Sequence, residues 1–176
     1  LTKEKINISN IIYYSKSRNK TYSLIKKKNL LAKTELITAD NINDQKILKC
    51  INKNDFHKSN IFSGYPGEIV KNQNLIKKKL IHCHSGDLPF FKGSTTLYYT
   101  LLKDKKICVT LIYLNKKIDE GKIILKKYFK TPIDKNKIEK NYDHEIRAET
   151  LVKFLKLKKN FFYKKFKNKN KISYNY

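Results

Sequence analysis

Methionine and tryptophan are absent from the 176-residue sequence, and glycine, proline and cysteine are scarce, with five, three and three residues. The cysteines are Cys50, Cys83 and Cys108, an odd number without CxxC spacing, which argues against a disulfide framework and a zinc ribbon. Reduced thiols are therefore expected. The lack of an initiator methionine is what a fragment of a longer protein would show.

Long apolar runs are also lacking. No stretch approaches the ~18 uninterrupted apolar residues that span a bilayer, and the first residues lack the apolar run of a signal peptide. The sequence therefore predicts a soluble, cytoplasmic protein without a membrane partner. A chain of 176 residues that is 40% hydrophobic and 12% aromatic fits one globular domain rather than a disordered tail.

Arginine is rare in a strongly basic chain. The 40 Lys and Arg residues outnumber the 15 Asp and Glu residues, which gives a net charge of +25, but only Arg18 and Arg147 are arginines. Gripping of phosphates and reading of bases favour the planar guanidinium group. The lysine excess is thus interpreted as compositional, and a nucleic-acid partner is not expected. The alternative from another class is a basic RNA-binding protein that uses lysine runs such as 26–28 and 77–79.

Short apolar segments alternate with helical patterns along the chain. Strands are predicted at 6–14, 35–38, 60–62, 79–82, 107–114 and 122–129. Helices are predicted at 21–31, from 43 onward, before 79, after a cap at 94–96, and at 142–157. This alternation predicts an α/β fold with a Rossmann-like, mostly parallel sheet covered by helices on both faces. The last two strands are expected to form a hairpin.

The domain organisation follows from the same pattern. Residues 1–157 are predicted to form the Rossmann-like domain, and 158–176 a basic Lys/Asn-rich tail. In the helix after residue 96, Leu97, Leu101 and Leu102 are expected to face the core. All five glycines fall in three breaks that follow successive strands. Ligands of open α/β sheets bind beyond the carboxyl ends of the strands, so these loops are expected to line one crevice.

Two histidines end one of these strands. Because side chains alternate along a strand, His82 and His84 are expected on one face and Cys83 on the other, in the core. The simpler reading is a pair of hydrogen-bonded residues at a strand end. Asp119 lies in a later break, shortly before Gly121, where an aspartate alone would be read as a turn former.

The chain around these residues resembles a known family. His82 to Gly93 read HCHSGDLPFFKG, and Ile118-Asp119-Glu120-Gly121 follows one helix and one strand later. This region, 62–129, resembles the formyltransferases that use 10-formyltetrahydrofolate, whose signature is an Asn-x-His strand end, a Leu-Pro loop closed by glycine, and a later Asp-x-Gly. The sequences Gly-Asp-Leu-Pro and Gly-Ser-Thr-Thr are most similar to those of the stand-alone, sugar-modifying members of the family.

The resemblance implies roles for individual residues. His84 and Asp119 correspond to the family's catalytic histidine and aspartate, and His82 replaces its catalytic asparagine. The formyl donor, 10-formyltetrahydrofolate, would be bound by the loop before the strand of the two histidines and by the loop between the two hairpin strands, at Gly67, Glu68, Ile69, Ile118 and Asp119. The acceptor would be a small primary amine, expected on a sugar nucleotide or glycan precursor, near Lys92, Gly93 and Ser94. The resemblance also allows a homodimer.

The chemistry of formyl transfer fits these residue types. Acyl transfer through a tetrahedral intermediate needs a group that stabilises an oxyanion and one that accepts the proton of the attacking amine. His84 as an imidazolium can stabilise the oxyanion or pass a proton to the leaving nitrogen. Asp119 can orient that ring and draw the proton from the amine.

Three alternatives stay open from the sequence. The exchange of asparagine for His82, together with a first strand–helix unit that is not found, allows an inactive homologue. A methionyl-tRNA formyltransferase-like activity would reconcile the basic charge with formyl transfer. Finally, His82, His84 and Asp119 are also a 2-His-1-carboxylate set, as in a metal-dependent enzyme, although that reading leaves the Leu-Pro loop unexplained.

Overall fold

The computed structural model describes residues 6, 8, 10–14, 35–52, 58–63, 69–134 and 136–169. Its strands are β1 (Asn10–Tyr14), β2 (Glu35–Ala39), β3 (Ile61–Phe62), β4 (Ile81–His84), β5 (Lys106–Tyr113) and β6 (Ile123–Lys130). Its helices are α2 (Gln45–Asn52), α3 (Gln73–Lys77), α4 (Thr96–Asp104), the π-helical turn η2 (Ile138–Tyr142) and α5 (Asp143–Lys169). The helix expected at 21–31 lies outside the described residues.

The strands form a parallel pair and a mixed four-stranded sheet. β1 pairs with β2 in parallel, and β3 pairs with β4 in parallel. β5 then pairs antiparallel with β4 and with β6, in the order β3-β4-β5-β6. The α/β class and the predicted hairpin of β5 and β6 are confirmed. Parallel pairing belongs to the first four strands, and the sheet is extended by the antiparallel hairpin.

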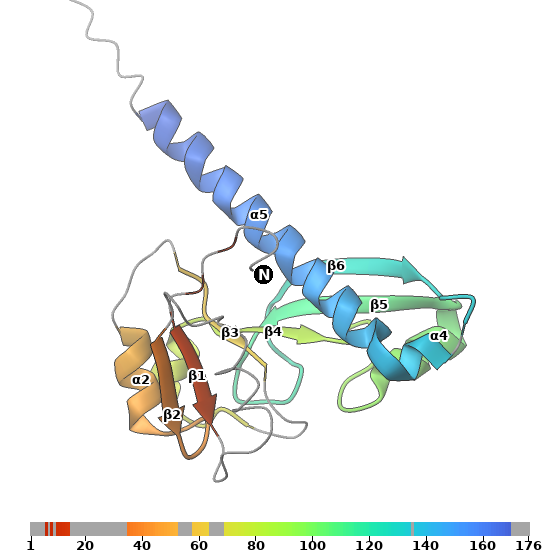
Figure 1. The fold of residues 1–176 in the computed structure, drawn as a ribbon, viewed down its shortest axis with the longest axis horizontal. Coiled ribbons are helices and arrows are strands. Elements are labelled where there is room, and N and C mark those ends of the chain that lie inside the picture. Colours follow the sequence, from red (N-terminus) through yellow and green to blue (C-terminus); the bar gives the residue numbers. More distant parts are fainter. Residues whose placement is uncertain are drawn as a thin grey trace, which may run out of the picture.

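Helices cover both faces of the four-stranded sheet. On one face, Ile81, Cys83 and Leu111 pack with Leu151 of α5, which lies across the sheet and extends beyond it in Figure 1. Phe62 is the register partner of His82, so its side chain lies on the other face of the sheet. There Phe62 and Leu80 pack with α2 and α3. The residues of β5 from 107 to 112 are fully buried, as expected for a strand covered on both sides.

Cys83 lies in this core, as predicted, with 7% of its surface exposed. Burial raises the pKa of its thiol to about 11, and burial also raises the pKa of the Cys108 thiol.

Since the thiolate is the reactive form, Cys83 in the native protein is expected to react with a disulfide reagent at pH 8 ~100-fold more slowly than after unfolding. Stopped-flow thiol titration measures this rate. A Cys50→Ser variant should lose the fast phase, since Cys50 is only partly buried, and three equally fast thiols would contradict the expectation.

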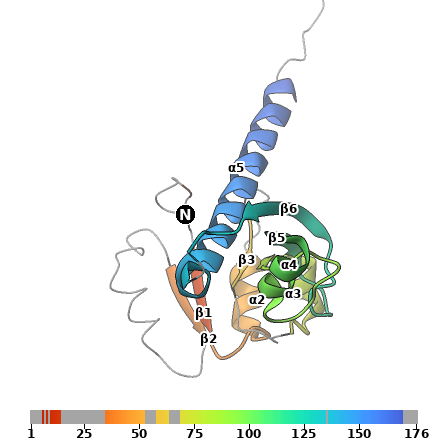
Figure 2. The same cartoon turned by 90° about the vertical axis from the view of Figure 1, so that its right-hand side faces the viewer.

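Four local expectations are corrected by the structure. The strand expected at 79–82 is β4, which begins two residues later because Lys79 adopts a left-handed conformation with φ 55° after α3. Thr95 precedes α4 with φ 58° and makes no side-chain capping bond, so the cap expected at 94–96 is absent there. Leu102 is 79% exposed and is not a core residue. Helix α5 does not end at residue 157 but continues to Lys169, projecting from the body of the molecule in Figure 2.

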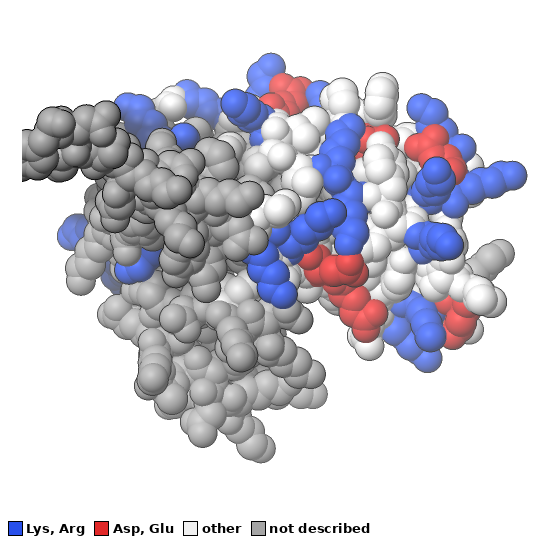
Figure 3. All heavy atoms as spheres, turned by 90° about the horizontal axis from the view of Figure 1, so that it is seen from above, with Lys and Arg blue, Asp and Glu red and all other residues white. Residues whose placement is uncertain are grey.

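Basic and acidic side chains are mixed on one face of the molecule. On the described part of the face in Figure 3, lysine and arginine side chains alternate with acidic ones instead of forming a continuous basic stripe. Such a mixture is typical of a solvated surface. Among the described helices, none has the length and apolar character needed to cross a bilayer.

Candidate active site

A cavity of about 840 Å³ opens at the carboxyl end of β4. It is bordered by the end of β3, the loop before α4, the loop between β5 and β6, and the start of α5. The described residues of the three glycine-bearing breaks thus meet at one cavity, as expected. The strand-end rule explains the first two breaks, but β5 is antiparallel to β4, so the third break starts beside the amino end of β4 and its loop reaches back to the cavity. His82, His84 and Asp119 lie together in its wall.

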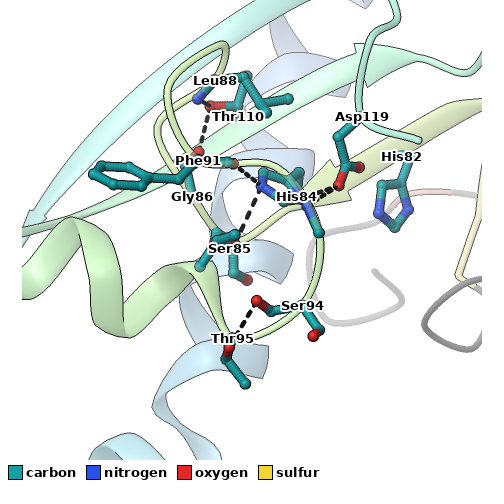
Figure 4. Close-up of polar contacts among 12 residues, drawn as sticks. His82, His84, Ser85, Gly86, Leu88, Phe91, Ser94, Thr95, Thr110 and Asp119 are labelled. Atoms are coloured by element: carbon teal, nitrogen blue, oxygen red, sulfur yellow. Dashed lines mark hydrogen bonds and ion pairs between the residues drawn. The ribbon is translucent and has the colours of Figure 1, made fainter. Parts of the chain in front are cut away.

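The ring of His84 is held between two oxygen acceptors (Figure 4). Its Nε2 atom lies 2.8 Å from the carbonyl oxygen of Phe91, and its Nδ1 atom lies 3.4 Å from Oδ2 of Asp119. A carbonyl only accepts hydrogen bonds, so Nε2 carries a proton and donates it. Thr96 lies against the same nitrogen at 3.2 Å, and its hydroxyl donates to the carbonyl of Ser85. Only 5% of the His84 side chain is exposed.

The second ring nitrogen of His84 faces the carboxylate of Asp119. Because Nε2 is the donor to Phe91, Nδ1 of a neutral His84 would point a lone pair at the carboxylate. A proton on Nδ1 removes the repulsion and forms an imidazolium–carboxylate pair. The side chain of Asp119 is only 8% exposed, so water screens this pair weakly. A proton or another cation between Nδ1 and Oδ2 therefore stabilises this arrangement.

The position of the Asp119 side chain is fixed by the backbone conformation of Asp119 itself and by a hydrogen bond from a second loop. It adopts a left-handed conformation with φ 54°, which aspartate tolerates better than most residues. Its Oδ2 atom accepts a 2.8 Å hydrogen bond from the backbone N–H of Gly93, which itself has φ 94°. The loop after β4 and the loop before β6 are thus joined at the carboxylate.

The His82 side chain offers fewer hydrogen-bond donors than an asparagine would at the same position. Its Nδ1 atom lies 3.4 Å from the carbonyl oxygen of Phe62, whose ring packs against the imidazole with centroids 5.7 Å apart. Burial lowers the pKa of His82, more than the Phe62 carbonyl and the Asp119 charge raise it, which favours a neutral ring. In this tautomer Nδ1–H donates to Phe62, and Nε2 presents a lone pair. His82 therefore lacks the second donor that an amide would offer.

The loop that carries Phe91 is anchored behind the site by Asp87. The ammonium of Lys126 lies 2.6 Å from Oδ1 of this buried carboxylate, and the Tyr128 hydroxyl donates to Oδ2 at 2.9 Å. The hydrogen bond to Asp87 raises the pKa of Tyr128 to about 12. The Thr110 hydroxyl donates to the carbonyl of Gly86 at 2.7 Å. Strands β5 and β6 thereby fix the position of the loop.

Helix α5 adds a second group of polar residues to the cavity. The Ser85 hydroxyl donates to Asp143, and Arg147 donates to the same carboxylate at 3.2 Å. Arg147 and His144 of α5 also line the cavity, as does Lys140 of the preceding turn η2. Sequence reasoning missed these residues because they lie about 60 positions beyond the histidines, in a helix recognisable only by its apolar spacing.

The remaining predicted site residues divide into three groups. Ile69, Ile118, Gly93 and Ser94 line the cavity. Lys92 does not line it, since its ammonium pairs with Glu120 at 2.9 Å. Gly67 and Glu68 lie outside the described residues, and their role as donor ligands stays a prediction.

No protein-family profile matches the chain. A methionyl-tRNA formyltransferase from Finegoldia magna is 27% identical to it over 140 residues, which cover 77% of this chain and 41% of the relative. The chain thus spans about two fifths of the length of this curated relative.

Solved structures are similar over most of the chain. A phosphoribosylglycinamide formyltransferase from Bacillus halodurans has a TM-score of 0.61 at 16% identity, covering 85% of this chain and 81% of that one. The formyltransferase PseJ from Anoxybacillus kamchatkensis, in complex with UDP-4,6-dideoxy-4-formamido-L-AltNAc and tetrahydrofolate, has a TM-score of 0.50 at 19% identity, covering 86% and 78%.

The fold is the α/β fold of the formyltransferases. The resemblance to the 10-formyltetrahydrofolate-dependent formyltransferases, inferred from the region of His84 and Asp119, is confirmed by both sequence and structure comparison.

Proposed function

We propose that the chain transfers a formyl group from 10-formyltetrahydrofolate to a primary amine, with an amino-sugar nucleotide or a glycan precursor as the acceptor. The observation that carries the proposal is the His84 ring held between the Phe91 carbonyl and the Asp119 carboxylate in the wall of the cavity. The sugar acceptor is supported by the Gly-Asp-Leu-Pro sequence of the loop and by the similarity to PseJ.

The lining of the cavity fits such a donor. One part of it is apolar and suits the faces of a flat ring system, with contributions from Phe62, Ile69, Val70, Leu114 and Ile118. Another part is polar and basic, and suits the carboxylate or phosphate groups of a donor and an acceptor, with Lys117, Lys140 and Arg147. Bound 10-formyltetrahydrofolate would supply an activated formyl group, whose oxygen gains negative charge during transfer while the amine loses a proton.

His84 and Asp119 meet these two demands. The imidazolium form of His84 places a positive charge in the cavity wall, where it stabilises negative charge that develops on a carbonyl oxygen. Asp119 is held toward this ring by the Gly93 N–H and accepts the proton that the attacking amine must lose. The C–N bond between the formyl group and the donor would then break, with the His84 imidazolium giving a proton to the leaving tetrahydrofolate nitrogen. His82, with Nε2 as an acceptor, cannot share the oxyanion role in this tautomer, so His84 carries more of it than in a site with asparagine.

The proposal is tested by binding and by turnover. Calorimetry with a stable 10-formyltetrahydrofolate analogue should show one saturable site on the folded protein. Turnover with 10-formyltetrahydrofolate should formylate a UDP-linked 4-amino sugar faster than glycinamide ribonucleotide or methionyl-tRNA, as measured by mass spectrometry. Absence of analogue binding to protein with a native circular dichroism spectrum would falsify the formyltransferase assignment. Preference for another amine would overturn the sugar acceptor alone.

Gly86 offers a test of how closely the His84 ring is positioned. A Cβ atom at Gly86 would lie 2.7 Å from Nε2 of His84 and 2.7 Å from Oγ1 of Thr96. The methyl group of Gly86→Ala must therefore move the catalytic ring, and a displacement of ~1 Å can cost ~100-fold in rate. We expect kcat/KM to fall by this order while the thermal unfolding midpoint changes by only a few degrees. Unchanged turnover in the alanine variant would show that the ring position is not critical.

A further inference from the structure

The exchange of an amide for an imidazole at His82 brings three metal-binding side chains together. His82, His84 and Asp119 each offer one ligand atom, and these atoms all lie within 4.8 Å of one another. In Figure 4 the carboxylate of Asp119 points between the two rings. Two histidines and one carboxylate are the protein ligands of many catalytic zinc sites.

The outer nitrogen of each ring already has the partner that a metal ligand needs. His84 donates its Nε2 proton to the Phe91 carbonyl at 2.8 Å, and His82 donates its Nδ1 proton to the Phe62 carbonyl at 3.4 Å. A ligating histidine usually donates its other N–H to a carbonyl or carboxylate, which fixes the tautomer. The second nitrogens, His84 Nδ1 and His82 Nε2, then present lone pairs, and the one on His84 faces Asp119.

The distance between His84 and Asp119 also suits a metal. Their atoms Nδ1 and Oδ2 are 3.4 Å apart, longer than an ordinary charge-assisted hydrogen bond. Two ligands ~2.1 Å from a tetrahedral zinc ion are separated by ~3.4 Å. Asp119 is held at this distance by the Gly93 N–H, and the cavity leaves space on the open side for a fourth ligand.

We propose that His82, His84 and Asp119 bind one Zn²⁺ ion, with the fourth position open to the cavity. The metal, instead of a proton, then lies between Nδ1 of His84 and the carboxylate of Asp119. Cys83 takes no part, because it lies on the opposite face of β4. This inference goes beyond the proposed function, and the two states exclude one another, since the metal occupies the Nδ1 lone pair and the carboxylate.

The test is metal binding in the absence of folate and amine. The chelator-treated 176-residue chain is titrated with Zn²⁺ by calorimetry and with Co²⁺ by visible absorption, which is intense for a tetrahedral site. Wild type is expected to bind one ion, and His82→Asn and Asp119→Asn to bind it ~100-fold more weakly or worse. The matched control is His144→Asn, which removes a cavity histidine outside the cluster and is expected to keep the wild-type affinity.

The outcomes separate this site from formyl transfer. Equal Zn²⁺ affinity of wild type and His82→Asn, or an equal loss in His144→Asn, overturns the metal site and leaves the transfer proposal untouched. If both proposals hold, added Zn²⁺ should inhibit formyl transfer by wild type and much less that by His82→Asn, which carries the asparagine of the related family. Zinc binding without any transfer would retain the metal site and remove the transferase role.

Discussion

Replacement of His84 by alanine is expected to lower kcat/KM for formyl transfer by about 10²–10⁴-fold, the usual contribution of a positioned proton-transferring side chain. The ring is 5% exposed and held by Phe91 on one side and Asp119 on the other, so its removal takes away both contacts at once. Asp119→Asn should give a loss of the same order, because the amide keeps the shape of the side chain but removes the negative charge. Initial rates at several donor concentrations measure both effects.

The controls for this prediction separate catalysis from folding. Asp104→Asn removes an exposed carboxylate at the end of α4 and should leave kcat/KM within about twofold of wild type. Both active-site variants should still bind the folate analogue. Because His84 and Asp119 act as a pair, the double variant should be little worse than either single one. Additive losses in the double variant would contradict the paired role.

The part of the site that could be read from the sequence rests on short-range rules. Alternation along a strand correctly placed His82 and His84 on one face and Cys83 in the core. The glycine-bearing breaks, and the resemblance to the formyltransferases, led us to expect that the Leu-Pro loop and the loop of Asp119 lie at one site. The hydrogen bond from the Gly93 N–H to Asp119 joins these two loops. The apolar run of β5 likewise predicted a strand buried on both faces.

The structural features that we did not predict depend on contacts and backbone conformations that no residue pattern indicates. The Phe91 carbonyl that fixes the His84 tautomer is a backbone group, and every residue has one. The left-handed backbone at Lys79 and Thr95 shifted the start of β4 and removed a helix cap, although neither residue type favours that conformation. The ion pair of Asp87 with Lys126 joins positions far apart in the chain, and a lysine-rich sequence offers many equivalent candidates. The resemblance to the formyltransferases therefore indicated the candidate reacting groups, but the sequence did not show the contacts that orient them.

Gly121→Ala is expected to cause the largest loss of stability among single substitutions near the site. A Cβ atom there would lie 1.7 Å from the carbonyl oxygen of Tyr113 and 2.8 Å from its carbonyl carbon. These are backbone atoms at the end of β5, where the Tyr113 N–H donates to the Lys122 carbonyl at 2.9 Å. The methyl group can fit only if the junction of β5 and β6 opens.

We expect the free energy of unfolding to fall by about 3 kcal/mol or more, at the upper end of overpacking effects. Urea denaturation followed by circular dichroism measures it. The matched control is Gly93→Ala, where a Cβ atom would meet no atom within 4 Å and only the positive φ of 94° is strained, at a cost of about 1–2 kcal/mol. Because Asp119 lies two residues before Gly121, the opened junction should also withdraw the carboxylate from His84. A Gly121→Ala protein as stable as Gly93→Ala would mean that the hairpin end adapts without breaking, and that Asp119 is held by the Gly93 hydrogen bond rather than by the junction.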